Sequence, residues 1–145
     1  MKSGKRKLGA DSNKRPLIYW DTCVLLAWMK NEQRSIGEMD GVEEVASLIR
    51  KEKARLVTST LTRAEILKGK VTRDAMDKMT RLFRRPNVVP LILDTPISIL
   101  TSEIRDYYRE TDFELLTPDA IHLATAIHHS VHEFHTFDGS DPDRK

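Results

Sequence analysis

A chain of 145 residues, 39% of them hydrophobic and 32% charged, has the length and composition of a single globular domain. Its longest apolar runs are too short to cross a membrane, and the basic N-terminus is not followed by the apolar segment of a secretory signal. The one cysteine, Cys23, excludes an internal disulfide framework, so we expect a protein of the reducing cytoplasm.

The net charge of +2 conceals a strongly basic N-terminal segment. Residues 1–15 contain six Lys or Arg and one acidic residue, a net charge of +5, which leaves −3 for the rest of the chain. Because so polar a segment cannot bury a core, we predict a disordered basic tail over residues 1–15 and a folded domain over residues 16–145. Binding to nucleic-acid phosphates and a purely solubilising role are equally compatible with this charge.

After the tail, short apolar runs alternate with amphipathic segments. Strands are predicted where apolar and β-branched residues form short runs, at residues 17–20, 54–60, 88–93 and 134–137. Helices are predicted where apolar residues recur at helical spacing, at residues 22–30, 38–53, 62–69, 71–83, 94–108 and 117–130. This alternation predicts an α/β fold, a three-layer α/β/α sandwich with a central, mostly parallel sheet.

Local signals refine these boundaries. Pro90 lies within the third predicted strand and cannot donate a ladder hydrogen bond, so that strand is expected at a sheet edge. Gly69 is expected to end the third helix as its C-cap. Thr117 and Pro118 are expected to start the last helix as N-cap and first helical residue.

Four carboxylates are expected at the carboxyl edge of this sheet. Asp21 directly follows the first strand, where it and Thr22 are both helix N-cap types. Glu65 lies in the helix after the second strand, Asp138 directly follows the last strand, and Asp119 begins the helix that enters near the same edge. In folds of this class, ligands bind beyond the carboxyl ends of the strands.

Each of these acids has an ordinary structural interpretation when it is taken alone, as a helix-start or turn residue. Taken together they point to a cation, because clustered carboxylates repel one another and raise one another's pKa unless a positive charge neutralises them. A ligand set made only of oxygen favours Mg²⁺ or Mn²⁺ over zinc. The sequence therefore predicts a divalent metal site at this edge.

The segments that carry these acids resemble the motifs of PIN-domain ribonucleases, and most closely those of the VapC-type toxins of type II toxin–antitoxin pairs. The segments occur in the family's order between residues 16 and 141 and read IYWDTCVLLAW, STLTRAEIL, TPDAIHLATA and HTFD. The resemblance implies a PIN-like nuclease domain over residues 16–145 that hydrolyses RNA phosphodiester bonds with Mg²⁺ or Mn²⁺.

The resemblance also implies a role for particular residues. Asp21, Glu65, Asp119 and Asp138 match the catalytic acids that bind the metal, and a metal held there would lower the pKa of its water and supply hydroxide near neutral pH. Three further residues match positions that support the site: Thr22, Thr136 and Asp141.

Expected partners follow from the same resemblance. Arg63 and Lys68 flank Glu65 and are candidates for RNA binding, although a solvated surface role is at least as common for such residues. A cognate antitoxin is expected to cover the acidic cleft with an Arg or Lys. The resemblance also implies a homodimer, to which the amphipathic segment 71–83 could contribute.

Two features depart from the family pattern. Cys23 stands where the family usually has Asn or Ser, and a thiol is a poorer partner for hydrated Mg²⁺. This difference is expected to alter the surroundings of the site and not the reaction. The family also usually has one more strand after the fourth acid, whereas residues 141–145, DPDRK, are too polar to form it.

Other functions remain open from the sequence. The same fold could bind RNA or protein without cleavage, although all four acids are present. A phosphoacceptor receiver domain is disfavoured, because a single Asp and not an acidic pair follows the first strand. Zinc binding by His128, His129, His132 and His135 is disfavoured by the lack of a second cysteine, and His122 is interpreted as structural.

Overall fold

The computed structural model describes residues 15–137, apart from the side chain of Lys68. The predicted basic tail lies outside the described residues except for Arg15, and so do Asp138 and Asp141. The boundaries of the tail and of the folded domain therefore stay predictions.

Strands and helices follow one another along the described chain as the hydrophobic pattern predicts. In chain order the elements are β1 (Leu17–Trp20), α1 (Thr22–Lys30), α2 (Glu38–Arg50), β2 (Arg55–Ser59), α3 (Leu61–Glu65), the 3-10 turn η2 (Lys68–Lys70), α4 (Arg73–Phe83), β3 (Val88–Leu91), α5 (Thr95–Arg109), α6 (Thr117–His128) and β4 (Glu133–His135). Within residues 15–137, no helix is long and apolar enough to cross a membrane.

The four strands form one sheet in the order β3-β2-β1-β4, and all neighbouring pairs are parallel. In this register, Ile18 of β1 lies opposite both Leu56 of β2 and Glu133 of β4. Pro90 lies in β3, at the edge of the described sheet, which confirms the position predicted from its missing N–H.

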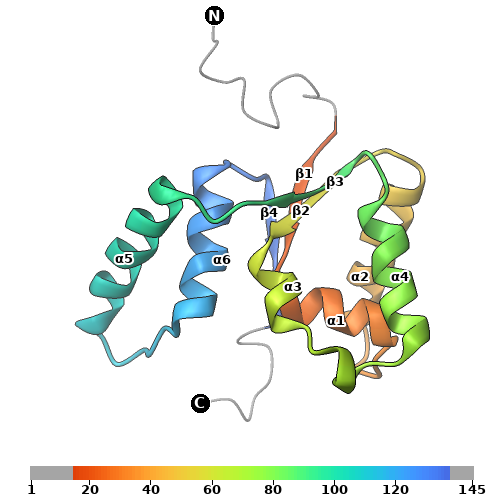
Figure 1. Cartoon of the computed structure of the whole chain (residues 1–145), viewed down its shortest axis with the longest axis horizontal. Coiled ribbons are helices and arrows are strands. Elements are labelled where there is room, and N and C mark those ends of the chain that lie inside the picture. Colours follow the sequence, from red (N-terminus) through yellow and green to blue (C-terminus); the bar gives the residue numbers. More distant parts are fainter. Residues whose placement is uncertain (1–14, 138–145) are drawn as a thin grey trace, which may run out of the picture.

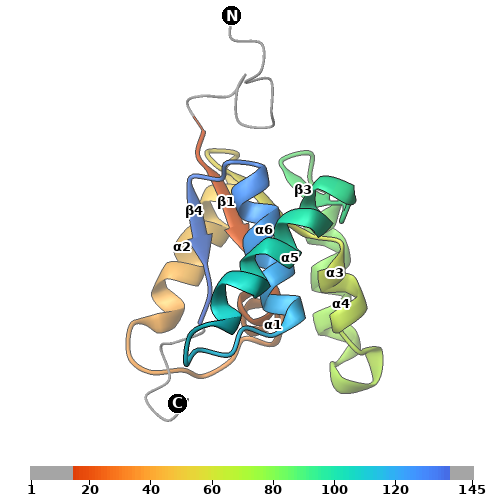
Figure 2. The ribbon, with the colours of Figure 1, turned by 90° about the vertical axis from the view of Figure 1, so that its left-hand side faces the viewer.

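Helices cover both faces of the sheet, which confirms the predicted α/β/α layers. In Figure 1, α1, α2 and α4 lie on one side of the sheet and α5 and α6 on the other. In Figure 2, α5 and α6 lie in front of the sheet, toward the viewer. Because the sheet is covered on both sides, its central strand β1 is buried along its whole length.

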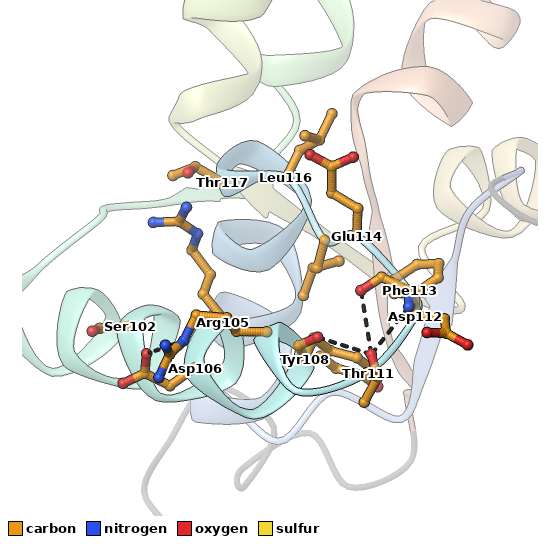
Figure 3. Close-up of a pocket in the computed structure, with 12 residues that line it drawn as sticks. Ser102, Arg105, Asp106, Tyr108, Thr111, Asp112, Phe113, Glu114, Leu116 and Thr117 are labelled. Atoms are coloured by element: carbon orange, nitrogen blue, oxygen red, sulfur yellow. Dashed lines mark hydrogen bonds and ion pairs between the residues drawn. The ribbon is translucent and has the colours of Figure 1, made fainter.

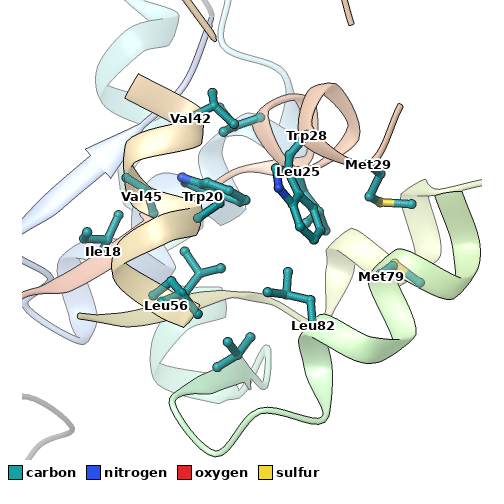
Figure 4. Packing of buried hydrophobic residues seen from close by; sticks show 14 of the residues in the cluster. Ile18, Trp20, Leu25, Trp28, Met29, Val42, Val45, Leu56, Met79 and Leu82 are labelled. Atoms are coloured by element: carbon teal, nitrogen blue, oxygen red, sulfur yellow. The ribbon is translucent and has the colours of Figure 1, made fainter. Parts of the chain in front are cut away.

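The side chains of β1 alternate between two apolar clusters, as the two-residue period of a strand requires. Ile18 and Trp20 belong to the larger cluster, between the sheet and α1, α2 and α4. Figure 4 shows part of this cluster. Leu17 and Tyr19 belong to the smaller cluster, which includes Ala126 of α6. Tyr19 therefore faces α6, and this direction matters for the site described below.

Two predicted helix boundaries are wrong. Gly69 does not cap α3, because α3 ends at Glu65 with Ile66 in an extended conformation, and Gly69 lies in the following 3-10 turn. Thr117 is not the N-cap of α6. Instead the carbonyl of Leu116 accepts the first helical hydrogen bond, from Ala120 N at 3.0 Å, so the helix begins one residue early.

Candidate active site at the carboxyl edge of the sheet

Asp21 is a buried carboxylate at the point where β1 becomes α1, and it is 5% exposed. Its Oδ1 accepts a hydrogen bond from the backbone N–H of Val24 at 3.2 Å, which makes Asp21 the N-cap of α1 as the sequence predicts. The backbone N–H of Asp21 lies 3.4 Å from the carbonyl of His135, at the end of β4. The helix N-terminus and the N–H of Val24 allow a carboxylate to remain buried here.

Cys23 is a second donor to Asp21. Its Sγ lies 3.0 Å from Asp21 Oδ1 and 3.9 Å from Thr136 Oγ1. Burial raises the pKa of Cys23 to about 12, and the hydrogen bond to Asp21 and the negative charge of Asp21 act in the same direction. The side chain is therefore a thiol at neutral pH. It donates to the acid, as an Asn or Ser at this position could.

Glu65 is the last residue of α3, and its carboxylate contacts side chains of α1 and α6. Its Oε1 accepts a short hydrogen bond from the hydroxyl of Thr22 and lies 3.1 Å from His122 Nε2. Thr22 Oγ1 is also 3.1 Å from Thr62 Oγ1, which in turn is 2.9 Å from Thr58 Oγ1. Thr22, which follows Asp21 in the chain and is one of the three predicted supporting residues, is thus in hydrogen-bond contact with Glu65.

Asp119 lies in the first turn of α6 and is half-buried. It precedes His122 by three residues, and residues with this spacing lie on the same face of a helix. Because His122 Nε2 lies 3.1 Å from both Glu65 Oε1 and Thr22 Oγ1, this face of α6 is turned toward the carboxyl edge. The fold thus brings the elements that carry Asp21, Glu65 and Asp119 to one place.

The other predicted site residues are placed only in part. Trp20 pairs with His135, so β4 ends beside the strand that carries Asp21, and Thr136 lies near Cys23. Arg63 is exposed on α3. Three predicted residues fall outside the described atoms: the side chain of Lys68, and Asp138 and Asp141 entirely.

The described acids fit a hard divalent cation by donor type. Asp21 and Glu65 each accept the hydrogen bonds found among the described residues on one oxygen, Oδ1 and Oε1, so the second oxygen of each carboxylate is left for a ligand. Among residues 15–137, however, no group of three or more His, Cys, Asp and Glu residues is close enough to hold a metal ion. The described residues alone therefore do not form a complete metal centre.

The histidines near the end of the described chain have other partners. His132 Nδ1 lies 2.9 Å from the backbone N–H of Leu17, and His135 Nε2 lies 2.8 Å from Glu133 Oε1. The rings of His128 and His129 meet edge to face at 5.0 Å. Over the described part of the chain, the zinc interpretation therefore finds no support.

Sequence reasoning did not find the connection made by His122 and Tyr19. His122 is 3% exposed, and its Nδ1 lies 2.6 Å from the hydroxyl of Tyr19. Burial raises the pKa of Tyr19 well above its ordinary value. Two spacings could have indicated it. His122 follows Asp119 by about one helical turn and Tyr19 precedes Asp21 by two residues, so each shares a face with a predicted metal ligand.

Two cavities lie away from these acids. One, of about 470 Å³, lies between the end of α5 and the loop that leads into α6, and Figure 3 shows its lining residues, among them Arg105, Asp106 and Glu114. The other, of about 410 Å³, lies next to Trp28 between α2 and α4 and has a basic rim. In that rim, Lys78 Nζ donates to the carbonyl of Trp28 at 2.8 Å. Neither cavity is lined by Asp21 or Glu65.

Three solved structures have a similar fold. The VapBC2 complex of Rickettsia felis bound to a DNA fragment of its promoter contains a chain that superposes with a TM-score of 0.59 and 12% identity, over 79% of this chain and 83% of that chain. FitAcB from Neisseria gonorrhoeae superposes with a TM-score of 0.56 and 25% identity, over 83% of this chain and 87% of that chain. FitAB bound to the IR36 DNA fragment superposes with a TM-score of 0.58 and 20% identity, over 85% of this chain and 86% of that chain.

These likenesses concern the fold. Among curated proteins, no similar sequence is found. The PIN domain model matches residues 18–140, from the first strand to beyond the last described one. The chain therefore belongs to the PIN domain family, as its four acidic motifs predicted.

Proposed function

We propose that this protein is a metal-dependent ribonuclease that hydrolyses RNA phosphodiester bonds in the cytoplasm, as the toxin of a type II toxin–antitoxin pair. PIN-domain proteins are nucleases that generally use divalent metal ions. The observation that carries the proposal is the junction at the carboxyl edge, where Glu65 is held by Thr22, the residue after Asp21, and by His122, on the helix of Asp119.

The chain's own residues have definite tasks in this proposal. Asp21, Glu65, Asp119 and Asp138 would hold Mg²⁺ or Mn²⁺. When bound, such an ion lowers the pKa of water and stabilises negative charge on the phosphate and the leaving oxygen. The thiol of Cys23 and the backbone N–H of Val24 hold one oxygen of Asp21 and so orient that carboxylate.

Supporting and RNA-binding roles are proposed for other residues. Thr22, Thr136 and Asp141 would support the acids, and Thr22 is in hydrogen-bond contact with Glu65. Arg63 and Lys68 would bind the RNA backbone, and the exposure of Arg63 on α3 is compatible with this role.

A cognate antitoxin and a homodimer are proposed as partners. The similar solved structures are VapBC and FitAB complexes, which supports an antitoxin partner for this chain. An antitoxin would cover the acidic edge with an Arg or Lys, because opposite charge favours docking. The homodimer is compatible with exposed apolar side chains near the sheet edge, such as Ile92, which is 70% exposed.

Cleavage of RNA by the purified, antitoxin-free chain in Mg²⁺ or Mn²⁺ tests this proposal. We expect cleavage that EDTA abolishes and that Asp119→Asn reduces at least about 100-fold, because the variant removes a ligand charge while keeping the shape of the side chain. Asp112→Asn, an exposed change in the loop before α6, is the matched control and should cleave like the wild type.

Two results would contradict the proposal in different ways. Cleavage that persists in EDTA, or that survives Asp119→Asn, would place the reaction elsewhere. A folded protein that binds RNA without cleaving any would favour the alternative function, a PIN-fold module that binds RNA or protein without catalysis.

A further inference from the structure

His122 joins the two sides of the acidic edge through a buried chain of hydrogen bonds. Its Nδ1 lies 2.6 Å from the hydroxyl of Tyr19, and its Nε2 lies 3.1 Å from Glu65 Oε1. Tyr19 lies on β1 two residues before Asp21, and His122 lies on α6 three residues after Asp119. One imidazole thus connects the three elements that carry the described acids.

The partners of His122 determine which of its nitrogens carries the proton. A carboxylate has only acceptors, so the nitrogen that faces Glu65, Nε2, must donate. In a neutral imidazole Nδ1 is then unprotonated, and it can accept a hydrogen bond from the phenol O–H of Tyr19. The chain of donors therefore runs from the Tyr19 hydroxyl to Nδ1, and from Nε2 to Glu65.

Both donors to Glu65 reach the same oxygen. The hydroxyl of Thr22 and Nε2 of His122 converge on Oε1, and no hydrogen bond from a described side chain reaches Oε2. Glu65 is 28% exposed, whereas His122 is 3% exposed. The buried side chain can therefore fix the orientation of the more exposed one, as partners of ligating groups do in metal sites.

We propose that His122 is a positioning residue, whose Nε2–H holds Oε1 of Glu65 so that Oε2 is presented to the metal, with Tyr19 fixing the tautomer. This inference rests on the proposed function, because it takes Glu65 to be a metal ligand. It assigns His122 a role beyond filling the space between α6 and the sheet, and it predicts that two conservative replacements of His122 will behave differently.

The two replacements are His122→Gln and His122→Asn. The amide nitrogen of Gln falls near the position of Nε2, so it can still donate to Glu65. The amide of Asn falls near Nδ1, so it can contact Tyr19 but cannot reach Glu65. Both are neutral amides that disturb the same buried position, and a purely structural role would therefore make them similar in every assay.

Calorimetric titration of the full chain with Mn²⁺ measures the effect. We expect His122→Asn to raise the dissociation constant about tenfold or more, as loss of a partner of a ligand typically does, and His122→Gln to raise it less than about threefold. Glu65→Gln is the reference and should weaken binding at least as much as His122→Asn. Urea unfolding in EDTA should give the two His122 variants similar free energies.

The outcomes separate this inference from the function on which it rests. If Glu65→Gln weakens Mn²⁺ binding but the two His122 variants bind alike, the positioning role is wrong and the metal site stands. If the wild type binds no Mn²⁺, or Glu65→Gln binds as well as the wild type, Glu65 is not a ligand and both proposals fail.

The tautomer can be measured without metal, in case the His122 variants do not fold. Nitrogen NMR of the imidazoles in the metal-free wild type should show His122 protonated on Nε2 and bare on Nδ1, and Tyr19→Phe should shift the Nδ1 resonance. A His122 without a proton on Nε2 would overturn the inference, because this nitrogen could then donate nothing to Glu65.

Discussion

Tyr19 and Trp20 are adjacent in β1 and equally buried, at 0% and 1% exposed, but their polar atoms have different surroundings. The hydroxyl of Tyr19 faces α6 and lies 2.6 Å from His122 Nδ1. Nε1 of Trp20 faces the larger apolar cluster and has no hydrogen-bond partner among the described residues. An unpaired buried donor costs about 1–3 kcal/mol, so apolar packing must offset that cost on the Trp20 face.

The two faces of the sheet therefore contribute differently to stability and to the candidate site. The face under α1, α2 and α4 stabilises the fold by burying apolar surface, and the ring of Trp20 lies 6.2 Å from that of Trp28 within it. The face under α6 accommodates paired polar atoms, and these lead to Glu65 at the carboxyl edge. Variants on the first face should therefore change stability, and variants on the second should change metal binding and catalysis.

The largest effect on stability is expected from Trp20→Ala. Removing a buried Trp leaves a cavity and loses its apolar transfer energy, which together cost about 3–5 kcal/mol. Urea unfolding monitored by circular dichroism measures the loss. The protein that remains folded should bind Mn²⁺ like the wild type, and a marked loss of Mn²⁺ affinity in that fraction would contradict the division between the faces.

Thr22→Val is expected to lower stability less than Trp20→Ala does, and to lower activity more. Valine has nearly the shape of threonine but cannot donate to Glu65 or contact Thr62 and His122. We expect a loss of about 1 kcal/mol in the free energy of unfolding, because Glu65, Thr62 and His122 each lose one polar contact but keep another. We also expect an activity loss of at least about tenfold.

Thr80→Val provides the comparison for Thr22→Val. Thr80 is exposed on α4, and its hydroxyl donates only to the carbonyl of Met76 within the described contacts. Stability and RNA cleavage should both stay close to those of the wild type. If Thr22→Val is equally mild in the cleavage assay, then the contact between Thr22 and Glu65 does not contribute to the site.

The smallest effect is a dependence of stability on alkaline pH. Burial raises the pKa of Cys23 from an ordinary value of 9.0 to about 12, so the folded state keeps a proton that the unfolded state loses. The resulting stabilisation is complete below pH 9 and is lost as the pH rises from about 9 toward 12. Urea unfolding at pH 8 and pH 10 should show a larger decrease for the wild type than for Cys23→Ser, and equal decreases would contradict the shift.

Local chemistry explains which parts of this structure could be predicted. Asp21 caps α1 because a carboxylate after an apolar run satisfies the first N–H groups of a helix, and Pro90 lies at an edge because it lacks an N–H. These are properties of a few consecutive residues, and the order of strands and helices follows from similar local patterns.

The connection between His122 and Glu65 could not be predicted in this way. The two residues are 57 positions apart, and their contact depends on how α6 docks against the sheet. For Gly69, in contrast, a local signal led to a wrong prediction. A glycine is a common residue after a helix end, but α3 already ends at Glu65, whose side chain is held by Thr22 and His122, and Gly69 lies within the next turn. Tertiary contacts decided both cases.

Anomalous diffraction from crystals of the full chain grown with Mn²⁺ would show directly whether this edge of the sheet is a metal site. We expect a manganese peak within bonding distance of a carboxylate oxygen of both Asp21 and Glu65, with Oε2 as the ligand atom of Glu65. A manganese ion bound elsewhere, for example at His128 and His129, or a well-ordered edge without any peak, would contradict this expectation.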